Sequence, residues 1–420
     1  MRRLYTVFIY LAIPYIICRL YWKGRHLAAY RQRIAERFSL GKPLSSPVDV
    51  WIHAVSLGEV VAAIPLIDAL LSKQKRVLVT TMTPTGSQQV KARFKDTVEH
   101  QYLPYDLPWA LRRFFKRMNA QVGIIMETEL WPNLVRHAKL AKIPLLLANA
   151  RLSDKAFKQY QKMVFFFKPV LSQFTAILAQ SELDAKRFIA LGAPVERVRV
   201  LGNMKFDLQL NIKNADHIAE LKNNWGSARP IIIAASTHEG EESQLLSELA
   251  RLRAAIPDLI LLIAPRHPER FNTVYELSKQ LGFNTGLRSQ AAQINANMDV
   301  VVLDSLGELL GFYQISDYAF VGGSLVPIGG HNVLEPIAMN VPVFCGPFMQ
   351  NSQSICDELC TANALKWVNN VSALADALIT MHQNPEQRLQ QIEQATAVLV
   401  ANKGTVARHL EQIEALSASQ

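Results

Sequence analysis

Short apolar runs rich in β-branched residues alternate along this chain with stretches of helical spacing, such as Val60–Leu71. Buried strands followed by amphipathic helices are typical of a parallel sheet covered by helices. In the first half the expected strands are Val48–Val55, Arg76–Thr81, His100–Leu103, Val122–Met126, Leu145–Ala148 and Ala176–Ala179. A second series comprises Pro230–Ala235, Leu259–Ala264, Val300–Leu303, Tyr318–Val321 and Val341–Phe344. The pattern therefore predicts an α/β protein with two similar halves.

The length of the chain agrees with this division. Its 420 residues exceed the roughly 100–200 that one domain usually takes. The polar, lysine-rich stretch 203–227 has few residues typical of strands, and we expect the chain to cross there between the halves. The predicted organisation is a segment at 1–28, domains at 29–210 and 211–400, and a helix at 401–420 that packs back on either half.

The N-terminal segment is uncharged and apolar from Leu4 to Cys18 and is flanked by cations. Its 15 residues fall short of the roughly 20 that a spanning helix needs, and Pro14 is expected to interrupt it. No small-residue cleavage site follows, as a signal peptide would require. We expect the segment to lie on, or dip into, the cytoplasmic face of a membrane. A single-span anchor and an ordinary buried helix are the alternatives.

Charge and cysteine content narrow the class of protein further. The formal net charge is +10, but residues 1–40 carry eight cations against Glu36 alone, so +7 of it lies there. The remainder is nearly balanced, which argues against a nucleic-acid-binding protein. The four cysteines show no C-x-x-C pair and no histidine at metal-binding spacing, which argues against a disulfide scaffold and a structural zinc site.

Several common catalytic motifs are absent from the sequence. It contains neither G-x-x-x-x-G-K-[ST] nor a G-x-G-x-x-G after a strand, so P-loop NTPases and dinucleotide-binding enzymes lose their main support. Neither G-x-S-x-G nor H-E-x-x-H occurs. The absence of D-x-D disfavours transferases that hold a nucleotide sugar through a divalent cation. Because ligands of open α/β sheets bind beyond the carboxyl ends of the strands, the turns after each strand hold the candidate residues.

Acidic residues follow two strands of the first half. Ser56 and Glu59 form an S-x-x-E pattern, and a capping box, in which Glu59 only satisfies a backbone amide, explains it as well as a function does. In the functional interpretation, the helix dipole keeps this carboxylate ionised, and it deprotonates a hydroxyl. Glu127 and Glu129 follow the apolar strand Val122–Met126, where an acid either pairs with a cation or has a catalytic role.

The second half offers turns suited to an anion. Pro265-Arg266 follows a strand, and its guanidinium fits bidentate phosphate binding. The turn 304–309 opens a helix directly after a strand. The glycine-rich stretch 320–330 leads into Asn332 and Glu335; its glycines allow close approach of a ligand, and Glu335 can accept hydrogen bonds from ribose hydroxyls. These turns predict a nucleotide-sugar donor site.

The sequence resembles the bacterial 3-deoxy-D-manno-octulosonic acid (Kdo) transferases of lipopolysaccharide synthesis over nearly its whole length. The matching runs are HAVSLGEV, TTMTPTGSQQV, LPYDLP, METELWPN, ANARLS, STHEGEES, APRHPERF and FVGGSLVPIGGHNVLEP, with the basic N-terminal segment. The resemblance implies a GT-B fold, in which two Rossmann-like domains face each other across a cleft, with an N-terminal acceptor domain and a C-terminal donor domain. It also implies CMP-Kdo as donor and lipid IVA as acceptor, at the cytoplasmic face of the bacterial inner membrane.

The resemblance also assigns roles to residues. The family's general base corresponds to Glu59, and its supporting transition-state residues correspond to Glu127 and Lys205. The CMP site corresponds to Pro265, Arg266, Leu306, Gly307, Glu308, Asn332, Val333, Leu334 and Glu335. The expected reaction is inverting, needs no metal or other cofactor, and adds one or two Kdo units. The alternatives are another GT-B transferase or an epimerase with a uridine donor, and a non-catalytic binding protein.

Overall fold

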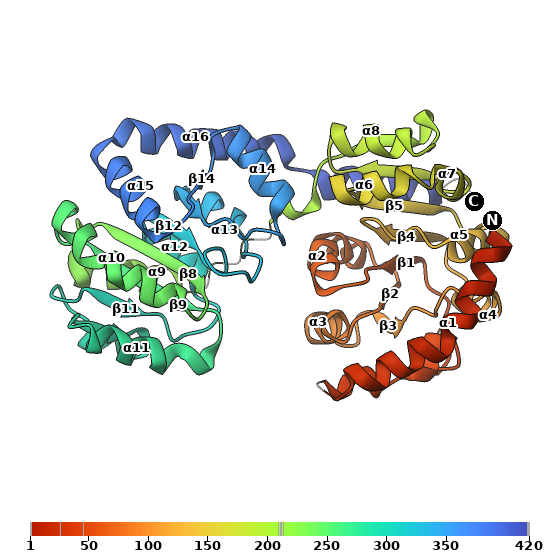
Figure 1. The fold of residues 1–420 in the computed structure, drawn as a ribbon, viewed down its shortest axis with the longest axis horizontal. Helices are drawn as coiled ribbons and strands as arrows, with labels where there is room; N and C mark the ends of the chain where they lie inside the picture. The colour runs from red at the N-terminus through yellow and green to blue at the C-terminus, as the bar shows by residue number, and fades with distance from the viewer. Residues whose placement is uncertain are drawn as a thin grey trace. The chain divides into compact units, whose positions relative to one another are not determined.

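The computed structural model describes residues 2–25, 27–44, 46–208, 210, 212 and 214–417. The chain forms two compact units, each built on one seven-stranded parallel sheet (Figure 1). The first unit comprises Met1–Asp207 and Gly404–Gln420, and the second comprises Leu208–Lys403. The last three residues of the expected helix 401–420 lie outside the described residues.

The sheet of the first unit has the order β3-β2-β1-β4-β5-β6-β7. Alternate residues of its buried strands face opposite cores; Trp51 lies in one and Ile52 in the other. Its strands are β1 Val50–His53, β2 Val77–Thr81, β3 Glu99–Tyr102, β4 Val122–Met126, β5 Leu145–Ala150, β6 Ala176–Ala179 and β7 Val198–Val200. Its helices include α2 Leu57–Ser72, α3 Pro84–Phe94, α4 Pro108–Met118, α5 Pro132–Leu140, α6 Asp154–Gln161, α7 Val164–Leu171 and α8 Glu182–Ala190. The order reverses between β1 and β4, and in open α/β sheets ligands generally bind beyond the carboxyl ends of the strands at such a reversal.

The second unit repeats this plan in the order β10-β11-β9-β8-β12-β13-β14, so its reversal lies between β8 and β12. Its strands are β8 Ile231–Thr237, β9 Ile260–Pro265, β10 Thr285–Leu287, β11 Val300–Val302, β12 Tyr318–Val321, β13 Val343–Cys345 and β14 Lys366–Trp367. Its helices are α9 Ala215–Gly226, α10 Glu241–Ala255, α11 Phe271–Gln280, α12 Leu309–Ile315, α13 Leu334–Ala338, α14 Gln353–Thr361, α15 Val371–Gln383 and α16 Pro385–Asn402. The predicted α/β class and the paired Rossmann-like sheets are thus confirmed.

The segment 203–227 contains the expected crossing, because the first unit ends at Asp207 and the second begins at Leu208, but it also holds a helix that its composition did not predict. Its first residues form a short 3-10 turn, Met204–Phe206, in the first unit, and α9 occupies most of the rest. The helix forms because Ile218, Leu221 and Trp225 share one face and are buried in the core of the second unit. The sequence analysis did not predict this helix, because most residues of the segment are polar and its apolar stripe is narrow.

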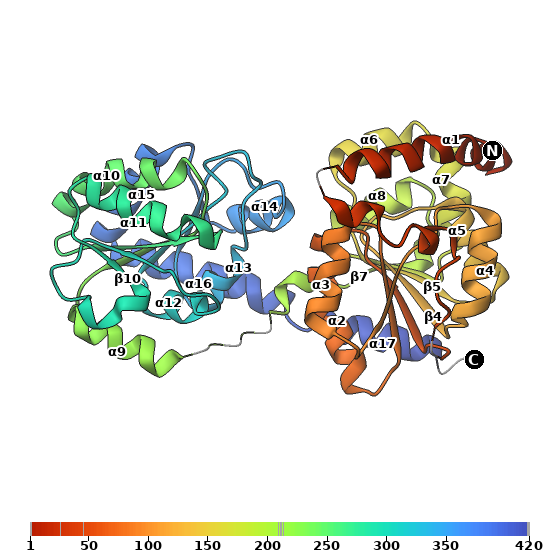
Figure 2. The ribbon, with the colours of Figure 1, turned by 90° about the horizontal axis from the view of Figure 1, so that it is seen from below.

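The C-terminal helix α17 Thr405–Ser417 returns to the first unit. Val406, Leu410 and Ile413 are buried in the core cluster that also contains residues of α2. Figure 2 shows this blue helix beneath the sheet of the first unit. The final helix is therefore an integral part of that unit although 196 residues of the second unit, 208–403, separate it in sequence.

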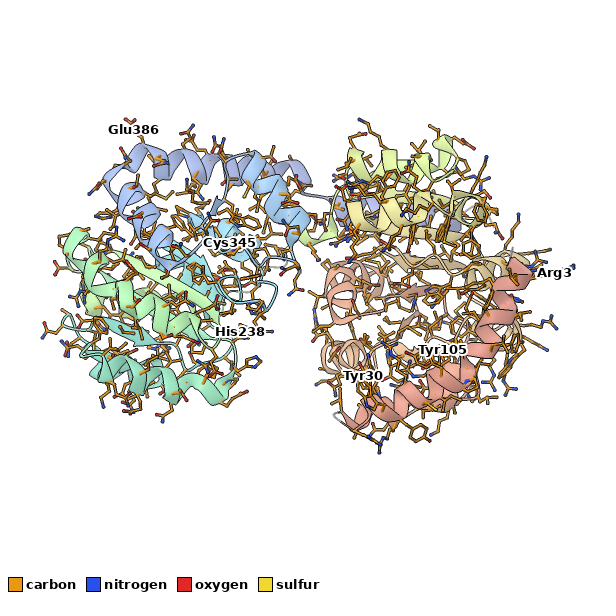
Figure 3. All side chains as sticks on the ribbon, viewed as in Figure 1. Arg3, Tyr30, Tyr105, His238, Cys345 and Glu386 are labelled. Carbon is orange, nitrogen blue, oxygen red and sulfur yellow. The ribbon has the colours of Figure 1, made fainter. Side chains whose placement is uncertain are left out.

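The N-terminal helix α1 Arg2–Lys23 corrects one expectation. It continues through Pro14 for 22 residues, which makes it long and apolar enough to cross a membrane. One proline removes a single helical hydrogen bond, and the flanking arginines lengthen the helix beyond the uncharged run. Its polar contacts join it to the first unit, since Arg2 and Thr6 hydrogen-bond Asn133 at 3.1 and 3.2 Å. Arg3, labelled in Figure 3, points away from the unit.

Candidate active site

Glu59 lies in the first turn of α2, directly beyond the carboxyl end of β1. Its carboxylate accepts hydrogen bonds from the Val55 backbone N–H at 2.8 Å and the Ser56 hydroxyl at 3.0 Å. The Ser56 Oγ in turn accepts the Glu59 N–H, so the capping box is present. Only 9% of Glu59 is exposed. Capping thus accounts for part of its hydrogen bonding, but it does not explain why an acid is buried there.

Burial raises the pKa of Glu59 to about 7, against the effect of the hydrogen bond from Val55. The nearby carboxylates of Glu127 and Glu129 raise the pKa further. A pKa near neutrality suits a general base, because the group is partly ionised yet basic enough to accept a proton.

Glu127 follows β4 and has a φ of +56°, a left-handed conformation that costs energy for a residue with a Cβ. Its carboxylate lies 3.8 Å from the guanidinium of Arg151, which follows the neighbouring strand β5. The adjacent strands bring these two side chains together at one edge of the sheet. Arg151 belongs to the ANARLS run, but the sequence did not mark it as a partner of Glu127.

Lys205 lies in the turn after β7, close enough to Glu127 and Glu59 for their charges to interact with it. Burial lowers the pKa of its ammonium group, and Glu127 opposes that effect. Two contacts hold the turn: the Met204 N–H donates to the Asn149 side chain at 3.0 Å, and the Lys205 N–H donates to the Asn203 side chain at 3.0 Å. Glu59, Glu127 and Lys205, predicted from separate motifs, therefore gather at the carboxyl end of one sheet.

Contacts with the C-terminal helix α17 also hold the turn that contains Lys205 in place. Asp207, two residues after Lys205, accepts hydrogen bonds from the backbone N–H groups of Gly404 and Val406 at 2.7 and 2.6 Å. His409 on α17 accepts the Asn149 N–H at 3.3 Å. Burial lowers the pKa of His409 to about 4, which keeps the ring neutral and able to accept.

In the second unit, Arg266 follows β9 and its backbone N–H donates to the Thr237 carbonyl at 2.9 Å. Its side chain is exposed, and its charge acts on Glu335, where burial raises the pKa and Asn332 and Arg266 lower it. The Asn332 amide donates to Glu335 at 3.0 Å. Arg266, Asn332 and Glu335 therefore share one neighbourhood.

The other predicted donor residues differ in what they can present to a ligand. The Leu306 side chain is 74% exposed. Val333 and Leu334 are buried, so only their backbone atoms are available. Glu308 accepts hydrogen bonds from Asn214 at 2.8 Å and Arg288 at 3.1 Å. These contacts hold the turn that begins at Leu306 and Gly307 against the rest of the second unit.

The glycine-rich turn after β12 packs closely against another turn of the same unit. A Cβ on Gly322 would lie 2.6 Å from the Ser236 carbonyl oxygen, so this glycine permits the backbone to pack against the turn after β8. The next three N–H groups bond Glu241. At Gly322 the group that approaches closely is therefore the protein's own backbone at Ser236.

Two Rossmann-like units in one chain are the architecture of the GT-B fold. A solved glycosyltransferase from Rickettsia africae shares this fold; the match covers 89% of this chain and 99% of that one, with a TM-score of 0.55 and 16% identity. The family model of 3-deoxy-D-manno-octulosonic-acid transferase (kdotransferase) matches residues 32–208.

Two curated relatives show the extent of the match. The 3-deoxy-D-manno-octulosonic acid transferase of Haemophilus influenzae is 40% identical over 98% of both chains. That of Bordetella pertussis is 33% identical over 89% of this chain and 88% of its own. The chain therefore belongs to the Kdo transferase family and is a glycosyltransferase that acts in lipopolysaccharide biosynthesis. The resemblance found in the sequence motifs is confirmed.

Proposed function

We propose that the protein transfers Kdo from CMP-Kdo to lipid IVA, with inversion at the anomeric carbon and with Glu59 as general base. The observation that carries the proposal is the buried Glu59 carboxylate, which lies at the switch point of the first sheet with its pKa raised to about 7. The neighbouring Glu127 and Lys205 supply opposite charges within its reach.

The chemistry of such a donor determines what the protein has to supply. Kdo is joined through its anomeric carbon to a phosphate, which leaves as an anion and needs no proton. Glu59 takes the proton of the attacking sugar hydroxyl as the new glycosidic bond forms and the bond to phosphate breaks. Arg266 and Lys205 offset the negative charge that develops, and no covalent enzyme intermediate forms.

Mass spectrometry of the lipid product tests the proposal. Purified protein is incubated with lipid IVA and CMP-Kdo, and the product is expected to gain the mass of one or two Kdo residues. A uridine diphosphate sugar serves as the control donor and is expected to give no product. Transfer from the uridine donor instead of CMP-Kdo would contradict the proposal.

We predict that transfer does not depend on a metal ion. Among the residues that the structure describes, no group of three or more His, Cys, Asp or Glu side chains could hold a metal. Arg266 and Lys205 take the role of balancing phosphate charge. Activity should therefore survive EDTA, as measured by transfer before and after chelation. Loss of activity that magnesium restores, with the donor shown to be intact, would contradict this.

We further propose that α1 lies in the interface of the cytoplasmic membrane, where an acylated acceptor is presented. Phe8, Leu11 and Tyr15 are 61%, 71% and 68% exposed, which is unusual for large apolar side chains. Arg2 bonds Asn133, and Arg31, eight residues beyond the helix, bonds the Tyr21 carbonyl. These contacts support a helix that lies along the first unit, with one apolar side facing lipid.

We predict that deletion of residues 1–28 releases the protein from membranes and leaves both α/β units folded. Deletion also removes the contacts to Asn133, so the double substitution Phe8→Asp and Leu11→Asp is a cleaner variant. The matched control is Leu140→Asp on α5, because Leu140 is 61% exposed on the same unit. Fractionation should find the double variant soluble and the control in the membrane pellet. A double variant that still sediments at high salt would contradict the assignment.

A further inference from the structure

Glu241 in the second unit occupies the position that Glu59 occupies in the first. Each lies in the first turn of the helix that follows the first strand of its sheet, α2 after β1 and α10 after β8. Each also accepts the backbone N–H of the turn before its helix, from Val55 and His238 respectively. The two carboxylates therefore share a place in the repeated fold.

The carboxylates of Glu59 and Glu241 differ in the number of hydrogen bonds that they accept. Glu241 is fully buried and accepts four backbone N–H groups. One comes from His238 at 2.9 Å, and three come from the turn after β12: Gly323 at 2.7 Å, Ser324 at 3.0 Å and Leu325 at 2.9 Å. Successive backbone N–H groups that converge in this way form an anion-binding nest. Here the protein fills the nest with its own carboxylate.

The turn that Glu241 holds leads into the predicted donor residues. Gly330 N–H donates to the Gly323 carbonyl at 2.8 Å, which closes the loop just before Asn332. The imidazoles of His238 and His331 hydrogen-bond through their Nε2 atoms, which are 2.8 Å apart, so the same two turns also meet through side chains. His238 is labelled in Figure 3 at the end of β8. A displacement of the 323–325 backbone would therefore move the segment that begins at Asn332.

We infer that Glu241 is a positioning residue for the nucleotide donor: its carboxylate sets the turn after β12, and through it the 332–335 segment, before the donor binds. The inference rests on the proposed donor site. Glu241 has no base function, because four backbone N–H groups, two on each oxygen, fill its acceptor sites, whereas each oxygen of Glu59 accepts one donor. The nest is likewise closed to the donor's phosphate, because the Glu241 carboxylate already occupies it.

Glu241→Gln tests this, with Glu242→Gln as the matched control. Glu242 is equally buried in the same helical turn, but it bonds Thr237 and Arg270 and makes none of the contacts to 323–325. An amide at 241 would present an NH₂ group to backbone N–H donors. We expect CMP affinity to fall about tenfold or more and the donor KM to rise equally, while the acceptor KM stays constant. The control should bind CMP within about twofold of wild type.

Titration calorimetry measures the CMP affinity of each variant, and thermal denaturation of the same samples shows whether the variant is folded. Equal CMP affinity in both variants would overturn the inference. Absence of CMP binding by the wild-type protein would instead overturn the proposed donor site.

Hydrogen exchange of the wild-type protein tests the inference if Glu241→Gln does not fold. The amides of 323–325 should be protected without nucleotide, because Glu241 already accepts them. Amides that exchange freely until CMP is added would show that the ligand organises the turn, and would overturn the inference.

Discussion

Glu59→Gln is expected to fold, to bind CMP nearly as well as wild type, and to transfer almost no Kdo. Glutamine keeps the size of the side chain and can still accept the Val55 N–H and bond Ser56, so the capping geometry survives. An amide cannot take the proton of the attacking hydroxyl. Loss of a general base typically lowers the rate by about 10²–10⁴-fold. Single-turnover transfer, nucleotide titration and thermal denaturation on one preparation measure the three properties.

The stability of two variants distinguishes a capping role of Glu59 from a catalytic one. Burial raises the pKa of Glu59 to about 7 from its ordinary 4.5. The protonated carboxyl therefore stabilises the fold; this contribution is complete below about pH 4.5 and is lost as pH rises through about 7. Glutamine imitates the protonated form, so Glu59→Gln should not melt below wild type at pH 8. The control Ser56→Ala removes the cap instead, and should lose about 1 kcal/mol of stability while retaining transfer.

The pH dependence of transfer follows from the same group. A base acts when deprotonated, so the single-turnover rate should rise with pH up to about 7 and then level. The residual rate of Glu59→Gln should lack this rise. Near-normal transfer by Glu59→Gln would remove Glu59 from catalysis and leave Glu127 as the candidate base.

The sequence was most informative where residues are buried. The expected strands Val122–Met126 and Ala176–Ala179 match β4 and β6 residue for residue, because unbroken apolar runs fix them. The sequence did not predict strands β7, β10 and β14. They are two or three residues long, lie at a sheet edge and contain no buried residue, so no apolar run marks them.

The candidate site, like the fold, could be predicted from the sequence only in part. Glu59 and Glu127 are predictable because each follows a recognisable strand, and the crevice lies beyond strand ends. The contacts that hold the neighbouring turns, by contrast, join residues far apart in sequence. Asp207 meets Gly404 across 197 positions, and Glu241 meets Gly323 across 82. No local pattern encodes such pairs, which the fold alone brings together.

Lys205→Gln is expected to lower transfer by about 10²-fold and leave CMP affinity nearly unchanged, because preorganised positive charge lowers the barrier rather than binding the ground state. The matched control is Lys222→Gln on α9. Lys222 is also partly buried, and it donates to the Ile315 carbonyl at 2.9 Å away from the candidate site. The control should transfer Kdo at the wild-type rate.

The pH profile of Lys205→Gln decides between two roles for this lysine. Lys205 lies near Glu127 and Glu59, so it either stabilises the leaving phosphate or balances those carboxylates. In the first role the rate falls equally at every pH, and the rise toward about pH 7 keeps its midpoint. In the second role, loss of the cation raises the pKa of Glu59, so the midpoint moves upward and the rate recovers at high pH. We expect the first result; full recovery at high pH would assign Lys205 to charge balance alone.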